Sequence, residues 1–310
     1  MSDGSKIEWT DATWNVVIGC DKVSPGCDHC YAIRTAHRFQ EHPNPAVAAA
    51  YAGTEQGGDW TGRVNLVESR LDLPLRWKRP RRIFVNAQSD LFHANVPDEF
   101  IARVWAVMAS APRHTFQVLT KRHGRMRSLL SSEEFRLAVQ RRIPHAGASR
   151  YVAAYWKTWP LPNVWLGVSV EDQARANLRV PALLDTPAAV RWLSCEPLLG
   201  PVRLDYMDID HGRFYQVNTL TGRNTDMARP CEDVTSIDWV VVGGESGPGA
   251  RPMHPDWARQ LRDQCVEAGV PFLFKQWGDH DSTGRRVGKR AAGRELDGRT
   301  WDEYPQAVGS

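Results

Sequence analysis

The sequence contains no apolar run near the roughly eighteen residues that a helix needs to cross a bilayer. Residues Met1–Thr10 are polar, include Asp3 and Glu8, and lack the apolar core of a signal peptide. We therefore expect no membrane span and no secretory leader, and a cytoplasmic location. An excess of one charge is also missing. The 39 basic and 36 acidic residues leave a net charge of +3, which is too small to indicate a nucleic-acid partner by itself.

Cysteine is sparse and unevenly distributed, with six residues in a chain of 310. Three lie within one stretch of eleven residues and three are isolated; in order they are Cys20, Cys27, Cys30, Cys195, Cys231 and Cys265. Because cytoplasmic thiols stay reduced, the stretch indicates metal binding rather than a disulfide framework. We expect structural roles for Cys231 and Cys265.

Short runs of apolar, β-branched and aromatic residues recur along the chain and predict strands that are buried on both faces. They are Trp14–Ile18, Ile83–Ala87, Thr115–Leu119, Val164–Ser169, Val190–Ser194, Ile237–Gly243 and Pro271–Lys275. Helical patterns lie between them, at Pro97–Ala109, Ser131–Arg141 and His254–Ala268. Alternating strands and helices predict the α/β class, here a partial (β/α) barrel of about six or seven parallel strands.

Three insertions and a tail interrupt this pattern. We expect a barrel over residues 1–278, with insertions at about 40–80, 143–162 and 203–236, and a polar C-terminal tail at 279–310. The second insertion mixes aromatic and basic residues over 150–157, a composition found in single-strand nucleic-acid binding and also in surface hairpins. Basic runs occur at 78–82, 141–142 and 285–290, where solvated surface charge is the simpler interpretation.

Polar residues follow almost every predicted strand. These strand-end groups include Gly19–Cys20, Ser89–Asp90, Lys121–Arg122, Ser169–Asp172, Cys195–Glu196, Gly243–Ser246 and Lys275–Trp277. Active sites of β/α barrels are built from the loops at this edge. The sequence therefore predicts that the functional site lies there.

The first of these loops has a C-x6-C-x2-C spacing, through Cys20, Cys27 and Cys30. Cysteine thiolates hold iron–sulfur clusters, and three of them leave one iron of a [4Fe–4S] cluster without a protein ligand. An open iron can bind the amino and carboxylate groups of S-adenosylmethionine (SAM). A zinc site is the alternative, with His29 or His37 as the fourth ligand.

The loop resembles that of the radical SAM superfamily, whose usual pattern is C-x3-C-x-aromatic-C. Residues Cys27–Cys30 match the second half of that pattern, and the gap before them is six residues instead of three. His29 stands where the pattern has its aromatic residue, and the resemblance therefore counts His29 among the cofactor-binding residues. The resemblance implies that a reduced cluster cleaves SAM to methionine and a 5′-deoxyadenosyl radical. It also implies an electron donor such as flavodoxin or ferredoxin.

The same resemblance assigns SAM contacts to strand ends. It implies Ser89 or Asp90 for the SAM amine, Lys121 and Arg122 for its carboxylate, and Ser169 and Glu171 for the ribose hydroxyls. Gly243, Gly244 and Glu245 would lie against the adenine. Cys195 would return a hydrogen atom to a product radical, as a cysteine does in the spore photoproduct lyase branch. A buried, inert thiol is the simpler interpretation of Cys195.

Longer segments resemble a phage-associated family of unknown function that is paired with a "three-Cys-motif partner" protein. They include IEWTDATWN, GCDKVSPGCDHCYA, LSCEPLLGP and WVVVGGESGPGARPMHP. The resemblance implies that protein as a partner, and with the basic runs it suggests DNA or tRNA as the substrate. Two alternatives stay open: a zinc-dependent hydrolase or nuclease using Asp90, Glu196 and Glu245, and a non-catalytic iron–sulfur interaction or sensor protein.

Overall fold

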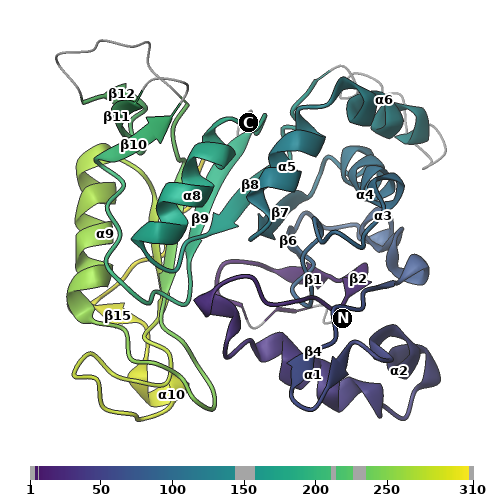
Figure 1. Ribbon diagram of the computed structural model, residues 1–310, viewed down its shortest axis with the longest axis horizontal. Coiled ribbons are helices and arrows are strands. Elements are labelled where there is room, and N and C mark those ends of the chain that lie inside the picture. The colour runs from purple at the N-terminus through teal and green to yellow at the C-terminus, as the bar shows by residue number, and fades with distance from the viewer. Residues whose placement is uncertain (1–3, 6, 144–157, 211–213, 226–234, 307–310) are drawn as a thin grey trace. The chain divides into compact units, whose positions relative to one another are not determined.

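The computed structural model describes residues 4–5, 7–143, 158–210, 214–225 and 235–306 (Figure 1). Its chain divides into two compact units, Met1–Leu166 with Thr186–Ala189, and Gly167–Asp185 with Val190–Ser310. Within the described part of the chain, no helix is both long and apolar enough to cross a bilayer.

Seven strands form one sheet in the order β1-β6-β7-β8-β9-β13-β14. They span β1 Ala12–Trp14, β6 Arg82–Val85, β7 Thr115–Thr120, β8 Val164–Ser169, β9 Val190–Cys195, β13 Trp239–Gly243 and β14 Phe272–Gln276. The pairs β1–β6, β6–β7, β9–β13 and β13–β14 are parallel. The predicted fold class, α/β with a partial β/α barrel, is confirmed.

The first unit carries most of the helices around β1, β6 and β7. They are α1 Tyr31–Gln40, α2 Pro45–Tyr51, α3 Leu73–Arg76, α4 Asp98–Ser110, α5 His123–Leu130 and α6 Glu133–Arg142, with single turns η1 Pro25–Cys27 and η2 Glu68–Arg70. Short antiparallel pairs join β2 Val17–Ile18 to β5 Asn65–Leu66, and β3 Glu55–Gln56 to β4 Asp59–Trp60. In Figure 1, α1 and α2 lie side by side, as do α4 and α6.

The second unit contains β9, β13 and β14 with α8 Gln173–Leu184 and α9 Pro255–Ala268. The expected insertion at 203–236 contains an antiparallel sheet of β10 Met207–Asp210, β11 Phe214–Asn218 and β12 Arg223–Asn224. After β14 come α10 Lys289–Ala292, β15 Glu295–Leu296 and β16 Arg299–Thr300. Figure 1 shows α10 and β15 in yellow, and β15 contacts β14.

Local signals in the sequence fix the helix ends. The Ser132 hydroxyl accepts a hydrogen bond from the Phe135 amide at 3.3 Å, which caps the start of α6. Helix α9 ends at Ala268 and is followed by Gly269, whose φ of 69° lies in the left-handed region that glycine adopts without strain.

The prediction of one strand over Trp14–Ile18 is wrong. Strand β1 ends at Trp14, and Val17–Ile18 pairs with β5 outside the large sheet. The cause is Asn86, whose side-chain oxygen accepts hydrogen bonds from the Val16 and Val17 amides at 3.0 and 3.2 Å. These amides bond to a side chain instead of a neighbouring strand, and the parallel pairing stops there.

Indole rings fill much of the sheet's core. Trp14 is fully buried in the first unit, and Trp192 and Trp239 are fully buried in the second. Gly167 makes room for Trp192, since a Cβ atom on this residue would lie 2.5 Å from the indole. The rings of Trp192 and Trp239 pack with centroids 5.4 Å apart.

Candidate functional site

The cysteine loop begins in a conformation that only glycine adopts easily. Gly19 has a φ of 97°, and a Cβ atom on it would lie 2.1 Å from the carbonyl oxygen of Arg63. Its amide donates to the Gln88 carbonyl at 3.4 Å, and it forms a parallel bridge with Ser89. The chain after β6 therefore sets the position of Cys20.

The rest of the loop turns into helix α1. The Cys27 amide closes the turn η1 by donating to the Ser24 carbonyl at 2.8 Å, and Cys30 is the residue before α1. The Tyr31 hydroxyl donates to the Ala87 carbonyl at 2.6 Å, which joins the start of α1 to the chain after β6. The predicted cofactor residue His29 is exposed between the last two cysteines.

The three thiols are free and partly exposed, and they influence one another electrostatically. Burial raises the pKa of the Cys20 thiol to about 12; the Asp90 carboxylate raises it further, and the Arg122 guanidinium opposes the shift. Burial also raises the pKa of Cys30, against the effect of Lys121. Because thiolates are the metal ligands, a metal that binds here must displace protons from these sulfurs.

Asp90 is buried behind the loop and accepts hydrogen bonds on both oxygens. Its donors are the Thr120 hydroxyl at 2.7 and 2.9 Å, the Lys121 amide at 2.9 Å and the Phe92 amide at 3.0 Å. Arg122 Nη1 lies 3.2 Å from the same carboxylate. Burial raises the pKa of Asp90, and these donors oppose that shift.

Arg122 joins this carboxylate to the cysteine loop. Its Nη1 donates to the sulfur of Cys20 at 3.6 Å, and its Nη2 forms an ion pair with the Asp21 side chain. The predicted residue Ser89 has a local role, because its hydroxyl donates to the Val17 carbonyl at 2.8 Å. The structure thus brings Asp90, Arg122 and Cys20 together.

The residue types on this loop are those that hold a [4Fe–4S] cluster with one open iron, because three thiols share one loop. Two cations, Lys121 and Arg122, act on these thiols electrostatically. Among the residues that the structure describes, no three His, Cys, Asp or Glu side chains are grouped closely enough to hold a metal ion as they stand. A cluster on this loop would require the three sulfurs to lie closer together than they do here.

In the second unit, Ser169 and Glu171 lie at the end of β8 and are buried. The Glu171 carboxylate forms an ion pair with Arg179 of α8 at 2.7 Å, and the same guanidinium donates to the Ser169 carbonyl at 2.7 Å. The side chains are 0% and 3% exposed, so the Glu171 carboxylate has little access to a ribose.

Two further carboxylates at strand ends also have cationic partners. Glu196 accepts from Lys275 Nζ at 2.6 and 2.8 Å and from the Gln276 amide at 3.1 Å. Glu245 accepts two bonds from the Arg251 side chain, at 2.7 and 2.9 Å, and a third from its backbone amide at 2.9 Å. Both acids therefore participate in ion pairs that tie the strand ends to one another and to the next loop.

The two glycines at the end of β13 make room for groups on neighbouring parts of the chain. A Cβ atom on Gly244 would lie 1.9 Å from the Trp277 carbonyl oxygen, and one on Gly243 would lie 3.3 Å from the Glu196 carboxyl carbon. Cys195, the predicted hydrogen donor, is fully buried, and burial raises the pKa of its thiol far above the ordinary value. Its surroundings are those of an inert core thiol.

Several partners were not predicted from the sequence. Arg179 lies on α8, eight residues after its partner Glu171, and Arg251 lies in a loop, six residues after its partner Glu245. The sequence alone does not show that either arginine folds back onto its carboxylate. Asp21 follows Cys20 and Thr120 precedes Lys121, so their position next to predicted site residues was the only sign in the sequence of a role at the site. Cys231 and the aromatic and basic run at 150–157 lie outside the described residues.

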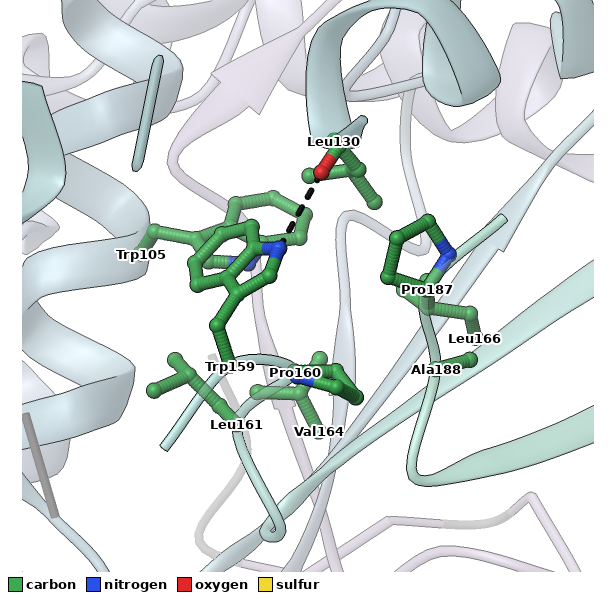
Figure 2. Close-up of a pocket in the computed structure, with 9 residues that line it drawn as sticks. All are labelled: Trp105, Leu130, Trp159, Pro160, Leu161, Val164, Leu166, Pro187 and Ala188. Atoms are coloured by element: carbon green, nitrogen blue, oxygen red, sulfur yellow. Dashed lines mark hydrogen bonds between the residues drawn. The ribbon is translucent and has the colours of Figure 1, made fainter. Parts of the chain in front are cut away.

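An apolar pocket lies elsewhere in the first unit (Figure 2). Its lining comes from α4, the end of α5 and the residues around β8: Trp105, Leu130, Trp159, Pro160, Leu161, Val164, Leu166, Pro187 and Ala188. In Figure 2 the Trp159 indole donates to the Leu130 carbonyl, at 3.1 Å. This pocket contains none of the predicted site residues.

The fold and the loop define an α/β protein with a parallel sheet and three cysteines near the end of its first strand. The chain belongs to the family described as "Protein of unknown function (DUF5131)", which it matches over residues 4–305. Comparison with curated proteins and with solved structures gave no match.

Proposed function

We propose that the protein is a radical SAM enzyme that holds a [4Fe–4S] cluster on Cys20, Cys27 and Cys30. One observation carries the proposal: three free thiols share a short loop beside the ends of β6 and β7, with the Lys121 and Arg122 charges next to them. The loop itself contains no fourth cysteine, so one iron is left for SAM.

When bound and reduced by one electron from a flavodoxin or ferredoxin, the cluster supplies reductive cleavage of SAM to methionine and a 5′-deoxyadenosyl radical that takes a hydrogen atom from the substrate. The loop residues hold the iron, and Gly19 and Tyr31 anchor the two ends of the loop. Lys121 supplies positive charge for the SAM carboxylate. Asp90 already accepts several hydrogen bonds from the protein, so its oxygens have little capacity left for the SAM amine.

We further propose a nucleic-acid substrate, DNA or tRNA, because basic runs occur at 78–82, 141–142 and 285–290. The three-Cys-motif partner protein and a cytoplasmic location, where the thiols stay reduced, belong to the same proposal. Gel-shift titration at low salt tests the substrate class. We expect binding that weakens as salt rises, and no binding to either nucleic acid would contradict this part.

Anaerobic reconstitution with iron and sulfide tests the central claim. We expect about four irons and four sulfides per chain, a brown protein, and 5′-deoxyadenosine when SAM and dithionite are added. Cys27→Ala should lose the colour and the product. The matched control is Cys265→Ala, which changes a buried cysteine of α9 and should keep both.

Other outcomes of the same experiment separate the alternatives. One zinc per chain, without sulfide, would replace the proposal with a zinc protein. A cluster that forms but yields no 5′-deoxyadenosine would indicate a non-catalytic iron–sulfur protein.

A further inference from the structure

Arg122 occupies an unusual position between two acids and a thiol. One guanidinium nitrogen, Nη1, lies 3.6 Å from the sulfur of Cys20 and 3.2 Å from a carboxylate oxygen of Asp90. The other nitrogen, Nη2, pairs with the side chain of Asp21. The Arg122 side chain is only 14% exposed, so solvent screens these interactions weakly.

The orientation of this guanidinium is fixed by Asp90 and by the residues that bind Asp90. Asp90 is itself held by Thr120, Lys121 and Phe92, and the Arg122 backbone amide donates to the Thr120 hydroxyl at 2.8 Å. The backbone of Arg122 is therefore tied to Thr120 at the end of β7, and its guanidinium is tied to Asp90 in the chain after β6. A planar guanidinium anchored in this way directs its N–H group at one sulfur.

An N–H donor and a positive charge beside a ligating sulfur stabilise the reduced form of an iron–sulfur cluster, because reduction adds a negative charge. Hydrogen bonds to sulfur and local net charge are among the features that set cluster potentials. Arg122 supplies both. Asp90 and Asp21 both reduce the local net charge, but Asp90 also holds the guanidinium against Cys20.

We propose that Arg122, positioned by Asp90, raises the reduction potential of the cluster through its hydrogen bond to the Cys20 sulfur. This inference rests on the proposed function. It assigns Arg122 to the protein-bound side of the cluster, and it leaves Lys121 as the cation for SAM.

The test is a potentiometric titration of the reconstituted protein at one pH, followed by absorbance and by electron paramagnetic resonance, without SAM or substrate. Arg122→Gln should lower the equilibrium constant for reduction about tenfold, the typical weight of one charge-assisted hydrogen bond, which is about 59 mV for one electron. Arg122→Lys keeps the charge but loses the planar pair of N–H groups, and it should lower the equilibrium constant for reduction about threefold. Arg127→Gln removes the same charge from an exposed position on α5 and should leave the potential unchanged.

The outcomes separate the inference from the function on which it rests. Equal potentials for the parent, Arg122→Gln and Arg127→Gln would overturn the inference and leave the cluster in place. If Arg122→Gln does not assemble a cluster, the Arg122→Lys protein provides the test. A reduction potential of Arg122→Lys equal to that of the parent would then overturn the inference. A parent protein that binds no cluster overturns both claims.

Discussion

Gly19 shows how one backbone conformation can decide whether the cysteine loop forms. Its φ of 97° is costly for any residue with a side chain, and a Cβ atom would lie 2.1 Å from the Arg63 carbonyl oxygen. We predict that Gly19→Ala lowers the free energy of unfolding by at least about 2 kcal/mol, from backbone strain and steric overlap together. Chemical denaturation monitored by tryptophan fluorescence measures it, and iron content after reconstitution should fall in parallel.

Gly124 provides the matched control for this substitution. It lies in helix α5, and a Cβ atom on it would meet no neighbouring group within 4 Å. Gly124→Ala should leave stability unchanged or raise it by up to about 1 kcal/mol, because alanine favours the helix. Identical denaturation midpoints for Gly19→Ala and the parent would contradict the argument.

The strands of the sheet were largely predictable from the sequence. Six of the seven predicted runs agree with observed strands to within two residues at each end, because strands buried on both faces read as continuous apolar runs. The first run failed because the break after Trp14 depends on Asn86, some seventy residues away. A local pattern carries no information about such a contact.

The candidate site divides in the same way. The cysteine loop could be predicted because its three thiols are close in sequence. The contacts of Arg122 could not, since Asp90 and Cys20 precede it by 32 and 102 residues and only the sheet brings them together. The need for glycine at position 244 could not be predicted either. The group that would clash with a side chain there is the Trp277 carbonyl, which lies at the end of another strand.

An ion-pair cluster joins helix α9 to the β15–β16 hairpin and should give a measurable pH dependence. Asp297 accepts from Arg259 at 2.9 Å and also from Arg262, and these partners lower the pKa of its carboxyl to about 2. Its stabilisation is therefore complete above the unfolded pKa of about 3.9 and is lost as pH falls toward about 2.

We predict that Asp297→Asn lowers stability at pH 7 by less than about 1 kcal/mol, because the pairs are partly exposed and screened. Asparagine tolerates the φ of 53° at this position, so the change isolates the charge. The difference from the parent should disappear between pH 4 and pH 2, as measured by urea denaturation across that range. Glu267→Gln, on the exposed face of α9, is the control. A difference that persists at pH 2 would contradict the assignment.

The polar segment after residue 278, expected from sequence to be a tail, covers the edge of the last strand. The Phe274 amide donates to the Trp301 carbonyl at 3.0 Å, and the Glu303 amide donates to the Phe272 carbonyl at 3.2 Å. Leu296 is fully buried. The backbone groups of β14 on this side are thus paired within the chain, and an exposed sheet edge is avoided.

Removing residues 279–310 should therefore unfold the second unit rather than trim it. The loss includes the burial of Leu296, the packing of Trp301 on Phe272 and the backbone bonds to β14, together about 5 kcal/mol, which is comparable to the whole stability of many domains. We expect the shortened protein to be insoluble or to lose cooperative thermal unfolding, as measured by circular dichroism. A chain lacking only residues 307–310 keeps all these contacts and should melt like the parent. If both shortened chains melted alike, the segment after residue 278 would be dispensable and β14 would be stable as an open edge.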